Sequence, residues 1–318
     1  IKDHFDKFSK ERKHTVEHFF DLFSREALPL FDQLRQSVNY NDANDFNVLV
    51  DADPANPQVP GVIDFGDLVY THTINELAIA LAYAMMHKEN PLEAACHVVR
   101  GYHQIFPLTE TELKVLFPLT VARLLISVTC AEINRAEHPE NAYLQISDAP
   151  AWILLNKLQH INSEFAHYAF RSVCNLEPVP QRPIFEKWVE SNSKNFIHPV
   201  DPGNQAQWLD LSAGSPDLGT MSEILNPVSL CSSINRMLSN SVALGRYDEA
   251  RAIYSTEAYQ IKRNDGWDWR TVHIGLDYFS AAGTAVKAPL KGTVYSIANN
   301  NQERDYGPTI ILQHQAGA

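Results

Sequence analysis

Apolar residues recur every three or four positions through most of the first half of the chain, which is the spacing of one face of an α-helix. The first such stretch covers residues 14–34, and Pro29 is expected to bend it near its end. Further stretches with the same period cover residues 75–87, 92–105, 111–136 and 149–173. The first half of the chain is therefore predicted to be mainly helical.

The stretch over residues 111–136 carries both a start signal and an internal proline. Thr109 lies just before this stretch and Glu112 lies in its first turn, which is the spacing of a capping box. In a capping box, a hydroxyl and a carboxylate satisfy two free backbone amides. Pro118 lies inside it and predicts a kink, because proline lacks an amide hydrogen and crowds the preceding turn.

Two short apolar runs, residues 47–50 and 62–65, interrupt this helical pattern. Residues 54–60 between them contain three prolines, and Gly66 ends the second run. Two β-like runs around such a turn predict a β-hairpin with a long loop.

The pattern changes again in the second half. Residues 177–219 contain six prolines and three glycines, which is typical of a linker. Short helices are predicted over residues 221–244 and 247–256, and strands follow at 272–279, 285–288, 293–297 and 309–313. We therefore predict a multidomain α+β protein, with a mainly helical domain over residues 1–175, a linker with short helices over 176–265 and an incomplete all-β domain over 266–318.

Composition narrows the class of protein. Of 318 residues, 45% are hydrophobic and 20% are charged, as in ordinary globular proteins, and the net charge of −12 argues against nucleic acid or an anionic membrane as the main partner. No run approaches 18 apolar residues, so no membrane-spanning helix is predicted. The four cysteines lie far apart in a long chain and are too sparse for a disulfide scaffold, which favours reduced thiols and a cytoplasmic location; none forms a Cys-x-x-Cys pair. Because the sequence begins at Ile1 and stops just after a predicted strand, we expect it to be part of a longer protein.

Oxygen-bearing side chains cluster at the open end of the predicted hairpin. Asp42 and Asn47 lie five residues apart before its first strand, and Asp64 lies at the end of its second. Such an arrangement offers two carboxylates and an amide oxygen, which suit Mg²⁺, and phosphoryl transfer requires a metal ion and a carboxylate that orients the attacking hydroxyl. Gly66 would allow a tight turn beside the metal. The alternative is that Asn and Asp are simply common in turns, but two matched motifs with an apolar run after each favour the functional interpretation.

Residues 40–47 (YNDANDFN) and 63–67 (IDFGD) resemble the C-terminal lobe of the aminoglycoside phosphotransferase and choline kinase family, and most closely its hydroxylysine kinase and homoserine kinase type. The resemblance covers about residues 1–175. It implies that Asp42 is the catalytic base, that Asn47 and Asp64 bind Mg²⁺, and that Asp67 shapes the metal or acceptor site. Tyr40 stands where the family has a histidine. The family's phosphate-gripping lobe, with its glycine-rich loop and lysine, has no counterpart before residue 14.

A second candidate site lies near the end of the chain. His273 and Asp277 stand four residues apart around Gly275, so they share one face of a strand and could bind Zn²⁺. The alternative is a hydrogen-bonded pair with a structural role.

This region, with its glycine turns at Gly283 and Gly292, resembles the lysostaphin-type zinc metallopeptidases. The resemblance implies that His273 and Asp277 are zinc ligands and that His314 is a catalytic histidine that does not bind the metal. The family's third ligand lies in a later His-x-His, which these residues do not include, so two protein ligands alone are too few for a catalytic zinc site.

The two modules together resemble the front part of a bacterial multidomain protein that continues into a class III aminotransferase-like domain. We therefore expect a phosphotransferase that moves the γ-phosphate of ATP or GTP to a hydroxyl of a small amine or amino acid. The alternatives are a zinc peptidase and a non-catalytic module, and the sequence leaves open whether the protein also forms a homo-oligomer.

Arg123, inside the apolar run 121–128, is expected to form a structural ion pair with a carboxylate rather than to contact substrate.

Overall fold

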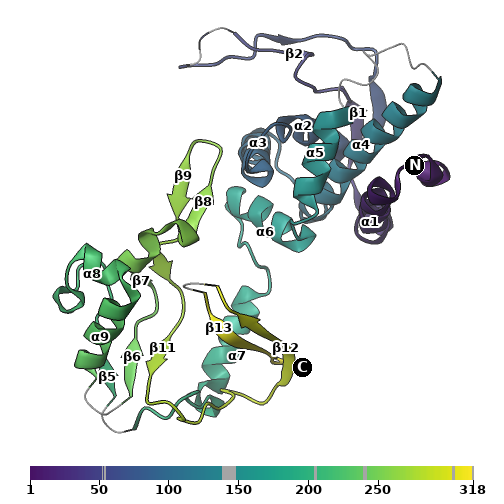
Figure 1. Cartoon of the computed structure of the whole chain (residues 1–318). Coiled ribbons are helices and arrows are strands. Elements are labelled where there is room, and N and C mark those ends of the chain that lie inside the picture. The colour runs from purple at the N-terminus through teal and green to yellow at the C-terminus, as the bar shows by residue number, and fades with distance from the viewer. Residues whose placement is uncertain are drawn as a thin grey trace. The chain divides into compact units, whose positions relative to one another are not determined.

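The computed structural model describes residues 1–51, 53, 55–137, 148–203, 206–238, 242–302 and 305–316. The chain forms two compact units, Ile1–Pro180 and Gln181–Ala318 (Figure 1), and each is described by itself.

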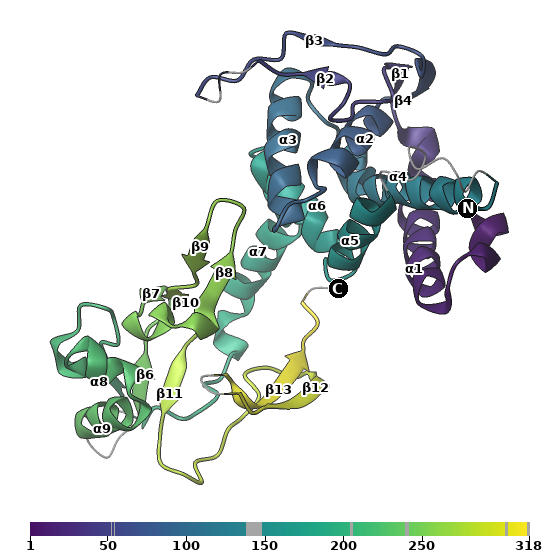
Figure 2. The same ribbon diagram turned by 45° about the horizontal axis from the view of Figure 1, so that its top comes forward.

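The first unit is mainly helical, as the periodicity predicted. Its helices are η1 (Lys2–Lys7), α1 (Lys10–Glu26), η2 (Leu28–Gln33), α2 (Ile74–Ala84), α3 (Pro91–Ile105), α4 (Glu110–Glu137), α5 (Asp148–Leu158) and α6 (Ser163–Val173). Helix α4 contacts α1, α2, α5 and α6 and so lies at the centre of the unit (Figure 2). Its residues Leu116, Phe117 and Leu124 are almost completely buried, which places the hydrophobic core around this helix.

The predicted start of α4 is confirmed in atomic detail. The Glu112 amide donates to the Thr109 hydroxyl at 3.3 Å, and the Thr109 amide donates to the Glu112 carboxylate at 2.8 Å. Pro118 is buried inside the helix and does not end it. By length and composition alone α4 could cross a membrane, but 67% of its most apolar window is buried against the rest of the unit, as in a core helix.

Two antiparallel ribbons carry the candidate site. Strand β2 (Val48–Leu49) pairs with β3 (Gly61–Val62), which confirms the predicted hairpin, and this hairpin extends away from the helices (Figure 1). Strand β1 (Gln36–Asn39) pairs with β4 (Val69–His72) and holds the base of the hairpin against the helical core. The pattern of apolar residues did not predict this second ribbon.

Two of the predicted helices have different bounds in the structure. The first ends at Glu26 and continues as the 3-10 helix η2 around Pro29. Residues 149–173 form two helices instead of one, because the Asn162 side chain accepts hydrogen bonds from the amides of Glu164 and Phe165 and begins a new helix.

The second unit combines short helices with small sheets. Its elements are α7 (Arg182–Asn192), η4 (Ser193–Asn195), β5 (Gln207–Trp208), η6 (Pro216–Leu218), α8 (Met221–Leu225), α9 (Pro227–Met237), β6 (Ala243–Gly245), β7 (Glu249–Ala250), η7 (Ala252–Ser255), η8 (Glu257–Tyr259), β8 (Gln260–Lys262), β9 (Trp267–Trp269), β10 (Val272–His273), β11 (Asp277–Phe279), β12 (Thr293–Asn300) and β13 (Gly307–Gln313). Strand β6 lies between β5 and β11 in a three-stranded sheet, and β12 and β13 form a hairpin.

Several predictions for this half differ from the structure. The described part of residues 176–265 is not an open linker, since β6 pairs with β11 of the predicted β domain and Leu209, Leu211 and Ile224 form a small buried core with it. Residues 247–256 contain strand β7 and a 3-10 turn instead of an α-helix, and residues 285–288 form no strand. Short polar elements of this kind bury too little apolar surface to leave a clear period in the sequence.

Candidate active site

The predicted catalytic loop begins at a backbone turn that is fixed by the first helix after the hairpin. Asn41 has a positive φ of 69°, a left-handed conformation that Asn adopts more readily than most residues. Its amide donates to the Glu76 carboxylate of α2 at 2.9 Å. This bond holds the backbone immediately before Asp42 against the helical core.

Asp42 and Asn47 are in direct contact, as their spacing predicted. The Asn47 side-chain amide donates to the Asp42 carboxylate at 2.7 Å and to the Asp42 carbonyl at 3.2 Å. Asn47 is only 8% exposed, so this pair is shielded on one side and held in one arrangement. Because the Asn47 nitrogen bonds Asp42, its amide oxygen is the atom left for a cation.

Asp64 reaches the same region through the hairpin. The Ile63 amide donates to the Asn47 carbonyl at 3.0 Å, which places the two motifs on adjacent, paired segments. Asp64 itself has a left-handed φ of 61°, and its carboxylate accepts from the Gly66 amide at 3.3 Å. The chain therefore turns sharply between the strand and Asp67.

Tyr40 links the two halves of the motif. Its hydroxyl donates to the Ile63 carbonyl, and its ring packs edge-on against Phe65 with 5.5 Å between ring centroids. Burial and the nearby carboxylates of Asp42 and Asp64 raise the pKa of Tyr40 above its usual value. Tyr40 thus ties the loop that carries Asp42 to the segment that leads to Asp64.

The chemistry of these residues fits a magnesium ion. Two carboxylates and the Asn47 amide oxygen are hard oxygen donors of the type that Mg²⁺ binds, with water and substrate phosphates completing the shell. Within the described ranges, no group of three or more His, Cys, Asp and Glu side chains is placed to hold a metal ion. The joint position of Asp42, Asn47 and Asp64 around one ion therefore stays a prediction.

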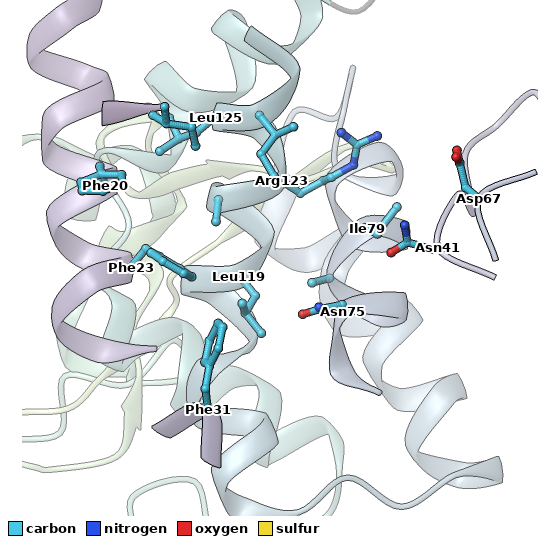
Figure 3. Close-up of a pocket in the computed structure, with 14 residues that line it drawn as sticks. Phe20, Phe23, Phe31, Asn41, Asp67, Asn75, Ile79, Leu119, Arg123 and Leu125 are labelled. Atoms are coloured by element: carbon cyan, nitrogen blue, oxygen red, sulfur yellow. The ribbon is translucent and has the colours of Figure 1, made fainter. Parts of the chain in front are cut away.

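A cavity of about 470 Å³ lies beside the catalytic loop. Figure 3 shows Asn41, Asp67, Asn75 and Arg123 on one side of it and the aromatic residues on the other. The described lining residues are Ile1, Phe20, Phe23, Phe31, Asn41, Asp67, Asn75, Ala78, Ile79, Leu119, Ala122, Arg123, Leu125 and Ile126. Asp67 therefore belongs to the wall of a pocket, where it could contact an acceptor.

The contacts of Arg123 differ from the ion pair that the sequence predicted. Its guanidinium donates to the Tyr83 hydroxyl at 2.9 Å and to the Ser127 hydroxyl at 3.2 Å. No carboxylate of the described part of the chain forms the expected ion pair with it. The sequence contained one signal, a single arginine within an apolar run, but nothing in it showed that this run lines a cavity.

In the second unit, the predicted pair is also in contact but has other partners. The His273 Nε2 atom lies 3.4 Å from the Asp277 carboxylate, and its Nδ1 atom lies 2.7 Å from the Tyr254 hydroxyl. Arg251 forms ion pairs with Asp277 at 2.7 Å and with Glu249 at 2.9 Å, and both Arg251 and Glu249 are more than nine-tenths buried.

These contacts do not fit a zinc ion held by the described residues alone. The Arg251 guanidinium already lies against the Asp277 carboxylate and supplies the positive charge that a metal would bring. His273 and Asp277 make two ligands where catalytic zinc sites use three. His314 lies 3.1 Å from the Lys291 carbonyl through its Nδ1 atom.

Comparison with known proteins points to the first unit. Residues 4–108 match the model of the phosphotransferase enzyme family, and this range includes the whole motif from Tyr40 to Asp67. No solved structure matches the chain.

The similar characterised proteins share one name. The chain is 32% identical over 152 residues to a hydroxylysine kinase of Mus musculus, 32% over 161 residues to one of Xenopus laevis and 30% over 151 residues to one of Danio rerio. These matches cover 46–48% of this chain and 40–43% of those proteins. The chain thus spans about two-fifths of the length of the curated relatives it matches.

Proposed function

We propose that the first unit belongs to a small-molecule kinase that moves the γ-phosphate of ATP or GTP to a hydroxyl group of a small amine or amino acid. The observation that carries this proposal is the 2.7 Å bond between Asn47 and Asp42 inside a segment that matches the phosphotransferase enzyme family. A catalytic carboxylate and a metal-binding amide held side by side are the parts that phosphoryl transfer requires.

Each residue has a distinct role in this proposal. Asp42 orients the acceptor hydroxyl and takes its proton as the bond to phosphorus forms. Asn47 and Asp64 would hold Mg²⁺, which neutralises charge on the nucleotide phosphates when it is bound. Tyr40 and Glu76 keep the loop in place through Ile63 and Asn41.

The relatives suggest the first acceptor to try. They are named hydroxylysine kinases, so 5-hydroxylysine is the substrate with which an assay should begin. Homoserine and simple amino alcohols would follow, because the cavity lined by Asn41 and Asp67 could hold any of them.

The test is phosphorylation by the protein as the cell produces it, with any flanking sequence included. Asp42→Asn should lower kcat by about 10²–10⁴-fold, the usual contribution of a positioned base. Asp45→Asn is the matched control, because Asp45 is an exposed carboxylate of the same loop. An Asp42→Asn enzyme that turns over at the wild-type rate would exclude this role.

A zinc peptidase is a second and weaker proposal: His273 and Asp277 approach each other, but a zinc ion there would have to displace Arg251 and would need a third ligand that the described residues do not supply. Metal analysis of the complete protein after purification in zinc should find zinc that His273→Ala removes. A zinc-free protein, or zinc retained by the variant, would leave these residues as a structural network. The aminotransferase-like neighbour and the cytoplasmic location stay predictions.

A further inference from the structure

Arg123 carries a positive charge into the cavity and forms no ion pair with any carboxylate of the described residues. Its side chain is partly buried, and no acidic group among the described residues lies within 4.0 Å of its guanidinium. A charged group removed from water is normally paired or hydrogen-bonded. Here its hydrogen-bond partners among the described residues are two neutral hydroxyl groups, so an anion is the missing partner.

The guanidinium is fixed in position before any ligand binds. Its Nη2 atom donates to Tyr83 and its Nη1 atom to Ser127, and the group lies over the Tyr83 ring at 5.6 Å from the centroid. These contacts use only part of the five N–H donors of an arginine. The remaining donors can form the two parallel bonds that arginine makes with a carboxylate.

Among the other residues that line the cavity, Asp67 carries a negative charge and Asn41 and Asn75 are polar. Asp67 lies on the same side of the cavity as Arg123 in Figure 3, together with Asn41 and Asn75. Asn41 directly precedes Asp42, and the Asp42 carboxylate is near enough to contribute to the raised pKa of Tyr83, although burial is the larger cause. A cation and an anion thus line one space, next to the loop that carries the proposed catalytic base.

An amino acid that carries a hydroxyl group matches this set of groups. Its carboxylate is complementary to Arg123, its ammonium group to Asp67, and its methylene groups to the apolar residues Ile79, Leu119 and Ile126. The cavity volume of about 470 Å³ lies in the usual range for small-ligand sites.

We propose that Arg123 binds the carboxylate of the phosphate acceptor, so that the acceptor is a hydroxy amino acid and not a simple amino alcohol. This inference rests on the kinase activity proposed above. Arg123 acts as a specificity-determining residue: it selects the acceptor and places its hydroxyl near Asp42 without taking part in proton transfer.

The test compares ligands that differ only in the carboxylate. Binding to the complete protein is measured by isothermal titration calorimetry without nucleotide, first for 5-hydroxylysine and for 1,5-diaminopentan-2-ol, which is the same molecule without its carboxylate. Homoserine and 3-aminopropan-1-ol form a second pair. The wild-type protein should bind the acid of at least one pair tenfold or more tightly than its amine.

Variants then assign this preference to one side chain. Arg123→Met should weaken binding of the acid at least tenfold and leave the amine unchanged, and Arg123→Lys should recover only part of the loss, because lysine lacks the planar fork. Arg100→Met is the control, since Arg100 is an exposed arginine of α3 outside the cavity. The ligand comparison on the wild-type protein needs no variant and holds even if Arg123→Met does not fold.

The outcomes separate this inference from the proposed function. Binding that requires the carboxylate and is lost in Arg123→Met supports the role of Arg123. This holds even if no acceptor is phosphorylated, although a lack of phosphorylation would refute the kinase proposal. Equal binding of acid and amine, no binding of either, or an equal loss for both in Arg123→Met would overturn the role of Arg123. Phosphorylation of the amines as fast as the acids would refute Arg123 selection while the kinase proposal stands.

Discussion

The first prediction concerns Glu112, which joins α4 to the ribbon that carries the candidate site. Its carboxylate is 1% exposed and accepts from two nitrogens of Arg35, at 2.8 and 2.5 Å. It also accepts from the Thr109 amide at 2.8 Å. Arg35 immediately precedes β1, and its carbonyl accepts from the Thr73 amide, so this one carboxylate connects the helical core to the β1–β4 ribbon.

Glu112→Gln keeps the size of the side chain and removes its charge. Hydrogen bonds to a charged group contribute about 1.5–3 kcal/mol each. The Arg35 side chain is 39% exposed and can regain water, so we discount the loss to about 2 kcal/mol in total. At about 2–4 °C per kcal/mol for a unit of this size, the Tm of the first unit should fall by about 4–8 °C.

The effect should depend on pH in a defined direction. Burial alone would raise the pKa of Glu112, but the hydrogen bonds from Arg35 and Thr109 outweigh burial and hold the pKa below its ordinary value of 4.5. A lowered pKa in the folded state stabilises the protein above the unfolded value and loses this contribution as the pH falls through the folded value. The difference in the free energy of unfolding between wild type and Glu112→Gln should therefore be largest at pH 7 and should become smaller below about pH 4.5.

Urea unfolding followed by far-UV circular dichroism measures this difference. Glu137→Gln is the matched control, because Glu137 is an exposed glutamate at the other end of the same helix, and its effect should be within about 0.5 kcal/mol of zero. A Glu112→Gln protein as stable as the control, or a stability loss that is the same at pH 7 and pH 3, would refute the reasoning.

Three further predictions follow from other contacts. Arg251→Met should destabilise the second unit by about 3–5 kcal/mol in urea unfolding, because it leaves the buried Glu249 charge without its partner, whereas a change below 1 kcal/mol would show that the network is dispensable. Asn162→Ala should cost about 1 kcal/mol in the same assay through loss of the α6 cap, and Asn162→Asp should restore it. Burial raises the pKa of the Cys96 and Cys174 thiols to about 11, so iodoacetamide at pH 8 should modify the two exposed cysteines first, as peptide mass mapping would show, and equal rates for all four would contradict it.

Local signals made much of the first unit predictable from its sequence. The helical period and the capping box at Thr109 and Glu112 lie within a few residues of what they determine, and both are confirmed. The β1–β4 ribbon was missed because it pairs residues at least 30 positions apart, and its buried Asn39 donates to the His72 carbonyl instead of packing as an apolar residue. Proline content likewise suggested a linker where residues distant in sequence form one sheet.

In the candidate site, too, local contacts were predictable from the sequence and long-range contacts were not. The spacing of Asp42 and Asn47 is local, so the sequence predicted their contact. Arg123 and Tyr83 lie 40 residues apart, and only the packing of α2 against α4 brings them together; Arg123 then lines the same cavity as Asp67. The proposed catalytic residues lie close together in sequence and can be recognised from it, whereas the contacts of the arginine proposed to select the ligand depend on long-range packing that one sequence does not reveal.

The Tyr40 contact has a consequence for the conditions under which the loop keeps its shape. An imidazole at this place would change its protonation near neutral pH and could rearrange its bonds as it did so. A phenol whose pKa is raised further by its surroundings remains a neutral donor to the Ile63 carbonyl through that whole interval. Any fall in turnover between pH 6 and 8 would then have to originate in a group other than this support.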